Sequence, residues 1–261
     1  MRLGALEAGG TKMVCAIGNA NGEIYERISI PTETPEITVP KMIEYFKEKD
    51  IQALGIGCFG PIDLNRKSET YGYITTTPKL AWKNYNIVGA FADALDIPVD
   101  TDVNGSALGE ATWGITKGLD NSIYITIGTG VGMGIISNGK LLHGMLHPEG
   151  GHVLLTRHPK DTYGGKCPYH SNCLEGLAAG PAIEARWGKK GIELADKKEV
   201  WELEAYYIGQ ALVDCIMLLS PQRIVLGGGV MHQEHMMPLV REEVKKQLNG
   251  YLVTKELEDL D

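Results

Sequence analysis

The stretch LGALEAGGTKMVCAIGNANG, residues 3–22, decides the fold of this chain. In it an apolar run enters a turn of two glycines, a threonine and a lysine, and a second apolar run leads to Asn21-Gly22. An Asn-Gly pair between two extended segments is a strong signal for a β-hairpin. The stretch therefore predicts two strands around a glycine turn and a hairpin to a third strand at EIYERISI, residues 23–30.

The same pattern returns in the second half of the chain. In SIYITIGTGVGMGIISNGK, residues 122–140, an apolar strand again enters a Gly-Thr turn, and a second strand again ends at Asn-Gly. The remaining sequence predicts helices near residues 35–49, 87–95 and 197–219, and strands at residues 51–59 and 223–230. We therefore expect a mixed α/β protein whose core is duplicated.

Composition excludes several classes of protein. A chain of 261 residues can form two modest domains, and 43% hydrophobic and 22% charged residues are ordinary for a globular protein. The 33 acidic and 25 basic residues give a net charge of −8, which disfavours a nucleic-acid partner. The sequence has neither an apolar run of the about 20 residues that span a bilayer nor a signal peptide at its start. We expect a cytoplasmic protein with no membrane partner.

The five cysteines divide into two groups. Cys15, Cys58 and Cys215 lie in apolar runs and are predicted to be buried packing residues. The other two belong to GGKCPYHSNCLEG, residues 164–176, which also holds a histidine. This stretch fits three kinds of site: a disulfide, a nucleophile or a metal clip.

A metal is the best of these three explanations. An odd number of cysteines in a reducing compartment argues against disulfides, and a nucleophile needs a base and only one thiol. Cys167, His170 and Cys173 supply three of the four ligands of a structural zinc site, and the fourth is His152 or His158.

Three glycine turns each follow an apolar strand. Glycine lets a backbone approach a ligand closely and aim several N–H groups at an anion. One such turn is usually only a tight hairpin, but three suggest a nucleotide held between two lobes, on a fold without the Walker A or Rossmann pattern. The turns are Gly9-Gly10-Thr11-Lys12, Gly128-Thr129-Gly130 and Gly227-Gly228-Gly229.

These motifs together resemble the ROK family of bacterial sugar kinases. The matching segments, in chain order from residue 1 to about residue 230, are EAGGTK, TDVNGSALGE, ITIGTGVGMG, HPEGGH, the Cys/His cluster with CLEG, AAGPAIEARWG and VLGGGV. EAGGTK, TDVN and His170 in place of a thiolate are most similar to the zinc-containing ROK fructokinases. Chains of this family usually continue some tens of residues beyond the ELEDLD with which this sequence ends.

The resemblance implies a two-lobed sugar kinase of the actin-like ATPase superfamily, with a ribonuclease H-like duplicated core and a structural zinc loop. The smaller N-terminal lobe, residues 1–113, carries the first phosphate loop and the catalytic aspartate. The larger C-terminal lobe, residues 114–261, carries the second phosphate loop, the zinc loop and the adenosine-side glycine turn. A homodimer is the implied assembly.

The implied reaction is transfer of a phosphoryl group from ATP to the 6-hydroxyl of a hexose, most simply D-fructose. Asp102 matches the general base, although by its own sequence context it could equally be a helix N-cap. The sugar ligands implied by the resemblance are Asn104, Glu149, His152 and Glu175, each of which in isolation could be a surface or structural residue. A glucokinase, a mannokinase, an N-acylamino-sugar kinase and a non-catalytic sugar sensor are the alternatives.

The resemblance also implies the nucleotide and metal contacts. Thr11, Lys12, Thr129 and Gly130 meet the phosphates, while Pro181 and residues 227–229 lie near the adenosine; Lys12 alone could be only a surface lysine. Glu7 could order Mg²⁺ through water. His152 is the implied fourth zinc ligand, so that the metal would orient a side chain that also faces the sugar, and His158 remains the alternative.

Overall fold

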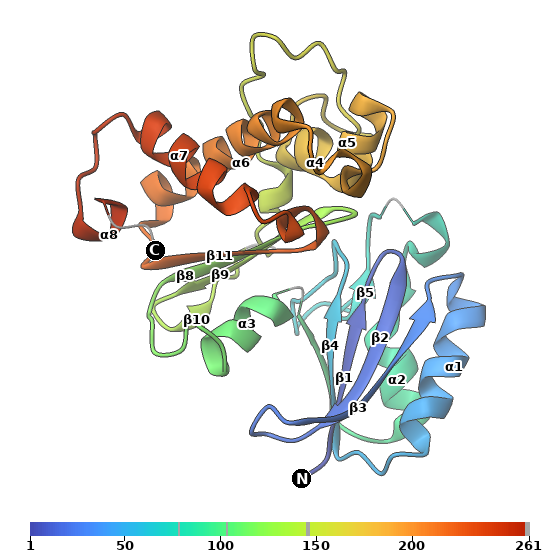
Figure 1. Ribbon diagram of the computed structural model, residues 1–261. Coiled ribbons are helices and arrows are strands. Elements are labelled where there is room, and N and C mark those ends of the chain that lie inside the picture. Colours follow the sequence, from blue (N-terminus) through green and yellow to red (C-terminus); the bar gives the residue numbers. More distant parts are fainter. Residues whose placement is uncertain (78, 103, 145–146, 259–261) are drawn as a thin grey trace. The chain divides into compact units, whose positions relative to one another are not determined.

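The protein divides into two compact units, which the labelled ribbon of Figure 1 shows. The computed structural model describes residues 1–77, 79–102, 104–144 and 147–258, without the side chains of residues 100–102 and 258. The first unit comprises Met1–Gly118 and Leu141–Pro148, and the second comprises Leu119–Lys140 and Glu149–Asp261.

The first unit is built on a five-stranded sheet with the order β3-β2-β1-β4-β7. Its strands are β1 (Leu3–Ala8), β2 (Lys12–Gly18), β3 (Ile24–Pro31), β4 (Ala53–Cys58) and β7 (Val99–Asp102), with a separate pair β5 (Tyr73–Ile74) and β6 (Tyr85–Asn86). Its helices are α1 (Pro35–Lys47), α2 (Ile87–Leu95) and α3 (Gly105–Thr112), with a 3-10 turn at Leu80–Trp82. The two predicted hairpin strands and the predicted helices near residues 35–49 and 87–95 are confirmed.

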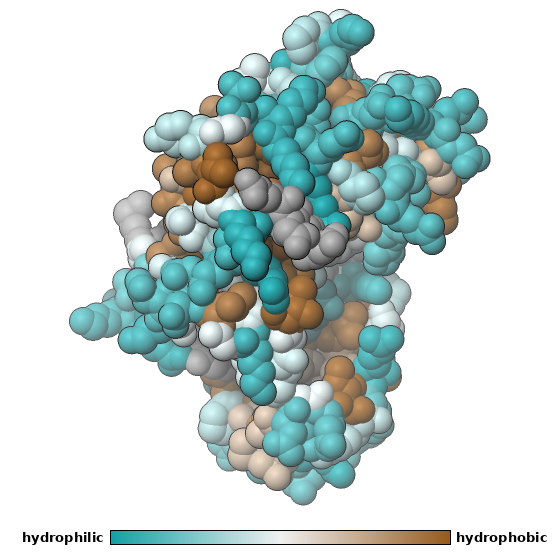
Figure 2. Space-filling view, turned by 60° about the vertical axis from the view of Figure 1, so that its left-hand side comes forward, coloured by the Kyte–Doolittle hydropathy of each residue, from teal (hydrophilic) through white to brown (hydrophobic). Residues whose placement is uncertain are grey.

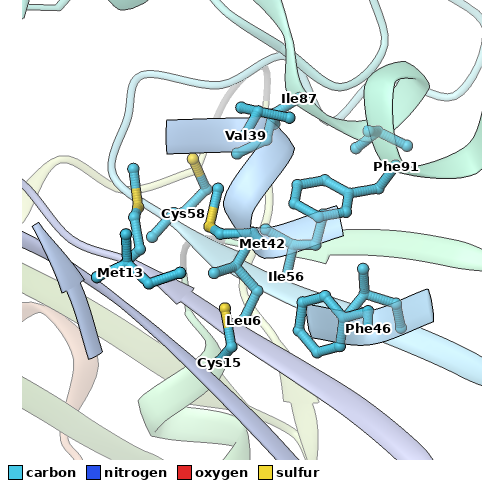
Figure 3. Close-up of a cluster of buried hydrophobic side chains, with 14 of the residues drawn as sticks. Leu6, Met13, Cys15, Val39, Met42, Phe46, Ile56, Cys58, Ile87 and Phe91 are labelled. Carbon is cyan, nitrogen blue, oxygen red and sulfur yellow. The ribbon is translucent and has the colours of Figure 1, made fainter. Parts of the chain in front are cut away.

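Alternation along the strands places the core of the first unit on one face of this sheet. In β1, β2 and β4 every second side chain is buried, and α1 and α2 cover that face with their own apolar residues. Figure 3 shows Leu6 and Ile56 from the sheet beside Met42, Phe46 and Phe91 from the helices. The rings of Phe46 and Phe91 meet edge to face at 6.1 Å, a favourable arrangement for an aromatic pair.

Three cysteines belong to the cores of the two units, as predicted. Cys15 and Cys58 lie in the core of the first unit and are labelled in Figure 3, and Cys215 is buried in the second. Burial raises the pKa of the Cys15 thiol to about 12 and that of Cys215 to about 11. These thiols therefore stay protonated near neutral pH and act as small apolar side chains.

The second unit is built on a four-stranded sheet with the order β10-β9-β8-β11. Its strands are β8 (Ser122–Ile127), β9 (Val131–Ser137), β10 (Lys140–Leu141) and β11 (Arg223–Gly227). Its helices are α4 (Leu174–Ala178), α5 (Gly180–Trp187), α6 (Lys198–Leu219), α7 (Met236–Leu248) and α8 (Lys255–Glu258), with 3-10 turns at Gly150–His152, Gly191–Leu194 and Gly229–His232. Helix α6, predicted near residues 197–219, packs against α4 and α7 (Figure 1).

The two sheets repeat one topology, which confirms the predicted duplication. In the first unit β1 pairs with β2 antiparallel and with β4 parallel. In the second, β8 pairs with β9 antiparallel and with β11 parallel. The order β3-β2-β1-β4 thus corresponds to β10-β9-β8-β11, and each of the first two glycine turns joins equivalent antiparallel strands.

A buried ionic cluster lies among the helices of the second unit. The guanidinium of Arg186, only 5% exposed, pairs with Glu204 at 3.0 Å and with Asp161 at 3.2 Å. Tyr207 donates a 2.6 Å hydrogen bond to Asp161, and the Arg186 guanidinium stacks 4.7 Å from the centre of the Tyr163 ring. Burial works against ionisation of Asp161, but hydrogen bonds and the Arg186 charge hold its pKa below its ordinary value. Arg186 is thus neutralised by Asp161.

Glu204 is expected to make the stability of the protein depend on pH. Burial raises its pKa from 4.5 to about 8, against the opposing charge of Arg186. Between these values the folded protein holds a proton that the unfolded chain releases, so the free energy of unfolding falls by about 1.4 kcal/mol per pH unit. This contribution is complete below about pH 4.5 and is lost as the pH approaches 8. Glu204→Gln should remove it, because the amide cannot ionise.

The measurement is urea unfolding at several pH values from 5 to 9 for both proteins. Subtracting the variant from the wild type cancels the titration of all other groups. The difference should decline steadily with rising pH; a difference independent of pH would contradict the prediction.

None of the helices in the described part of the chain combines the length and the apolar character that a membrane crossing requires. On the face that Figure 2 shows, hydrophilic residues predominate and hydrophobic residues form small groups between them.

Candidate functional site

Four predicted metal ligands come together in the second unit. The ligand atoms of His152, Cys167, His170 and Cys173 all lie within 4.8 Å of one another. His152 Nδ1 is 3.8 Å from Cys167 Sγ and 3.6 Å from Cys173 Sγ, and His170 Nδ1 is 3.7 Å from Cys167 Sγ. Tetrahedral zinc with ordinary Zn–N and Zn–S bonds separates such atoms by about 3.5 Å. The donor set and its spacing therefore fit a structural zinc ion.

His158, the alternative fourth ligand, does not join this group. Its Nδ1 accepts a hydrogen bond from the Lys160 amide at 3.2 Å, and its ring packs edge to face on Tyr206. Among the described residues, His152 rather than His158 joins Cys167, His170 and Cys173.

The surroundings of Cys173 do not prepare its thiol as a nucleophile. Burial raises the pKa of the Cys173 thiol to about 11, and the nearby Cys167 and Glu175 add to the effect. A nucleophilic cysteine needs surroundings that lower the pKa, whereas a bound metal ion removes the proton from a coordinating thiol directly. The surroundings of Cys173 therefore favour the metal explanation over the nucleophile.

Side-chain and backbone hydrogen bonds shape the loop that carries the two cysteines. Arg157 donates to the carbonyls of Tyr163, Gly164 and Ser171, and so holds both ends of the loop. Cys173 is the N-cap of α4, where its Sγ accepts from the Gly176 amide at 3.3 Å. No pattern in the sequence singles out Arg157, because its partners are backbone carbonyl groups, which every residue type carries.

The second and third glycine turns also lie together in the second unit. The turn after β8 is closed by a 2.9 Å bond from the Gly128 amide to the Gly130 carbonyl, and the side chain of Thr129 is exposed. A Cβ built on Gly128 would lie 3.9 Å from the amide nitrogen of Gly229. The Gly228 backbone has φ +90° and a Cβ there would collide with the Ile127 carbonyl, so this position requires glycine. Gly227 ends β11 directly before it.

Helix α5 begins beside the same turns. The Gly180 amide donates to the Gly128 carbonyl at 2.8 Å, and Pro181 follows in the first turn of α5. The residues predicted on the adenosine side and those of the second phosphate turn are thus neighbours within one unit.

Glu175 lies against the second glycine turn. Its Oε2 accepts a 3.0 Å hydrogen bond from the amide of Val131, the residue that follows Gly130. Glu175 is predicted from the family resemblance as a sugar ligand. Its contact with Val131 has no signal in the sequence, because the two residues are 44 positions apart. The other predicted sugar ligand of this region, Glu149, is exposed and its carbonyl accepts from the His152 amide at 2.9 Å.

The first unit carries the remaining predicted residues. Between β1 and β2 the Gly9 amide donates to the Lys12 carbonyl at 3.1 Å, in a turn that continues through Gly10. The side chains of Thr11 and Lys12 are exposed, and so is that of Glu7 on β1. These exposed donors and the carboxylate are accessible to a ligand.

Asp102 ends strand β7, where its backbone pairs with Gly57 of β4. Its side chain lies outside the described residues. Asn104, two positions on, is 1% exposed, and its Nδ2 is 3.3 Å from His143 Nε2. Asn104 occupies the N-cap position of α3, but its side chain makes no capping hydrogen bond. Helix capping is therefore not the reason for an asparagine at this position. His143 carries no sequence motif and was not predicted.

Comparison with known proteins agrees with this arrangement. The ROK family matches residues 3–259. A protein of Bacillus subtilis (strain 168) is 53% identical, with 98% of this chain and 87% of the relative covered. A relative from Streptococcus mutans named "Fructokinase" is 48% identical, with 98% and 89% covered.

A solved structure gives the same result for the fold. The crystal structure of a ROK hexokinase from Thermus thermophilus superimposes with a TM-score of 0.74 at 27% identity, covering 96% of this chain and 90% of that one. The predicted sugar kinase fold is therefore confirmed. This chain belongs to the ROK family.

Proposed function

We propose that this protein is a fructokinase that transfers the γ-phosphoryl group of ATP to the 6-hydroxyl of D-fructose. The observation that carries the proposal is the 48% identity, over nearly the whole chain, to a relative named fructokinase. The proposal is supported by two glycine turns that each link two antiparallel strands, by a third glycine turn that follows β11, and by the Cys/His group in the second unit.

Asp102 is the proposed general base. Attack of the sugar oxygen on the γ-phosphorus requires that the hydroxyl lose its proton, and a carboxylate at the end of a strand can accept it. Asn104, Glu149, His152 and Glu175 are the proposed sugar ligands, since amide, carboxylate and imidazole groups each bond to hydroxyls. Asn104 suits this role because it is held beside His143 inside the first unit.

The glycine turns are the proposed phosphate ligands. Backbone N–H groups of Gly10 and Gly130, with the hydroxyls of Thr11 and Thr129 and the Lys12 ammonium, would take up charge on the phosphoryl oxygens. Gly9 and Gly128, whose amides close the two turns, would let the backbone approach the phosphates closely. Pro181 and Gly227 to Gly229 would line the adenosine side. Mg²⁺ would neutralise phosphate charge, and Glu7 is the proposed residue that orders it through water.

Zinc is the proposed ion of the Cys/His group, with a structural role. His152, Cys167, His170 and Cys173 would hold it in a closed shell. A zinc-bound His152 would have its ring orientation fixed, which is useful for a side chain that also meets the sugar. We further propose lobes at residues 1–113 and 114–261, a homodimer, and a cytoplasmic location.

A substrate panel tests the proposal. With MgATP, kcat/KM for D-fructose should exceed the values for glucose, mannose and N-acetylmannosamine by about 10²-fold or more, because a site built to bond one set of hydroxyls leaves polar groups unpaired with another. Transfer to a different sugar would favour a glucokinase, mannokinase or amino-sugar kinase. Sugar binding without turnover would favour a sensor.

A further inference from the structure

One short helix connects the metal-binding loop to the second glycine turn. Helix α4 starts at the Cys173 N-cap, where the Gly176 amide donates to the Cys173 Sγ, and the Lys166 amide donates to the Gly176 carbonyl at 2.9 Å. The Leu174 amide donates to Val153 at 3.0 Å. The Lys166 contact therefore joins α4 to the metal-binding loop, and the Leu174 contact joins the start of α4 to the carbonyl of Val153, which directly follows His152.

The other contacts of this helix go to the glycine turn. Glu175 Oε2 accepts from the Val131 amide, and a Cβ built on Gly130 would lie only 2.7 Å from the same oxygen. Directly after α4, the Gly180 amide donates to the Gly128 carbonyl. The turn is thus held at both ends, once by a side chain and once by the backbone.

The contact of Glu175 with the Val131 amide differs from the backbone bond between Gly180 and Gly128, because it places a carboxylate beside a turn that is proposed to bind phosphates. A negative charge at this position weakens anion binding by Coulomb repulsion. A hydrogen bond from an amide to a half-buried carboxylate is strong and directional, so it can fix the course of the turn. The carboxylate also has a second oxygen, Oε1, so that a bond to a sugar hydroxyl does not compete with the bond to Val131.

We infer that Glu175 is a positioning residue for the nucleotide, which holds the turn at Gly128–Gly130 in its phosphate-binding conformation and ties it to the metal-binding loop. This inference rests on the proposed kinase function. It extends the sugar-binding role expected for Glu175, because it predicts an effect on nucleotide affinity when no sugar is present.

Three substitutions separate the effect of the hydrogen bond to the Val131 amide from the effect of the negative charge. Glu175→Gln keeps an oxygen that can accept from the Val131 amide but loses the charge. Glu175→Asp keeps the charge, but its carboxylate is one methylene too short for the Val131 contact. Glu175→Ala loses both. Glu184→Ala, an exposed glutamate on the next helix, α5, is the matched control.

The experiment is calorimetric titration of the zinc-loaded, full-length proteins with Mg²⁺ and a non-hydrolysable ATP analogue, without sugar. Glu175→Ala and Glu175→Asp should weaken nucleotide binding about tenfold, the effect of one lost hydrogen bond to a charged group. Glu175→Gln should stay within about twofold of the wild type, because its weaker hydrogen bond and the loss of the repelling charge act in opposite directions. Glu184→Ala, which removes an exposed carboxylate, should also stay within about twofold. Zinc content and Tm, measured on each protein, identify any variant that has lost its fold.

The outcomes are distinct for the two proposals. Absence of nucleotide binding by the wild type would overturn the proposed kinase function itself. If the wild type binds and the Ala and Asp variants bind equally well or more tightly, Glu175 acts on the sugar alone and the inference is wrong. If Glu175→Ala is unfolded, nucleotide binding by Glu175→Asp and Glu175→Gln still tests the inference. Weaker nucleotide binding by Glu175→Gln than by Glu175→Asp would overturn it.

Discussion

Replacing Asp102 by asparagine is expected to lower kcat for fructose phosphorylation by about 10³-fold, the usual contribution of a general base. Asparagine has nearly the same shape and still accepts a hydrogen bond, but it cannot take the proton of the attacking hydroxyl. The effect should fall on turnover, while fructose and nucleotide affinities change by less than about threefold. Steady-state kinetics with MgATP and separate binding titrations measure the two quantities.

Asp96→Asn is the matched control for this substitution. Asp96 is an exposed residue of the same unit at the C-cap of α2, with φ 53°, a conformation that asparagine tolerates as well as aspartate. The control should turn over at the wild-type rate. Full activity of Asp102→Asn beside an unaffected control would exclude Asp102 as the base.

The strand framework of both units could be predicted because its signals are local. Alternating apolar residues and the two Asn-Gly pairs identify antiparallel strands wherever they occur, and the repeated order of the patterns indicated the duplication. The parallel pairing of β4 with β1 and of β11 with β8 follows from that duplication once one unit is known.

Contacts between distant segments could not be predicted in the same way. The described residues of Leu141–Pro148 belong to the first unit, although Leu141 also ends strand β10 of the second sheet. Arg186 lies in the motif AAGPAIEARWG, yet only the fold brings it to Asp161 and Glu204. Periodicity identifies the buried face of a helix, but it does not identify which charged residue on another element will meet it.

The proposed metal ligands could be predicted from the sequence only in part. Cys167, His170 and Cys173 share one short stretch, so their spacing alone predicted a metal clip. The choice of His152 over His158 was carried by the family resemblance, since both histidines precede the loop by few residues. In the structure His152 lies in the 3-10 turn Gly150–His152, where a Cβ on Gly151 would collide with the Val131 carbonyl. That close approach of two backbones has no signal in the sequence.

Removal of the proposed zinc ion is expected to destabilise the second unit strongly. Residues 157–172, all of them described, form neither helix nor strand, and a loop of this length inside a compact unit needs side-chain ties. A structural zinc ion contributes its binding free energy to folding. A strong chelator should therefore release about one zinc per chain and lower Tm by about 10 °C. Metal analysis and calorimetry with and without chelator measure both effects.

The zinc content of purified variants tests which side chains bind the proposed ion. Cys173→Ala and His152→Ala should be purified with less than about a tenth of the wild-type zinc, because a closed tetrahedral shell loses affinity steeply when one ligand is removed. Cys215→Ala removes another buried thiol, from α6, and His158→Ala removes the imidazole that does not join the group. Both variants should keep one zinc per chain. Zinc retained by His152→Ala and lost by His158→Ala would reassign the fourth ligand. Wild-type protein that binds no zinc and does not respond to chelation would show that the four side chains stabilise the loop without a metal.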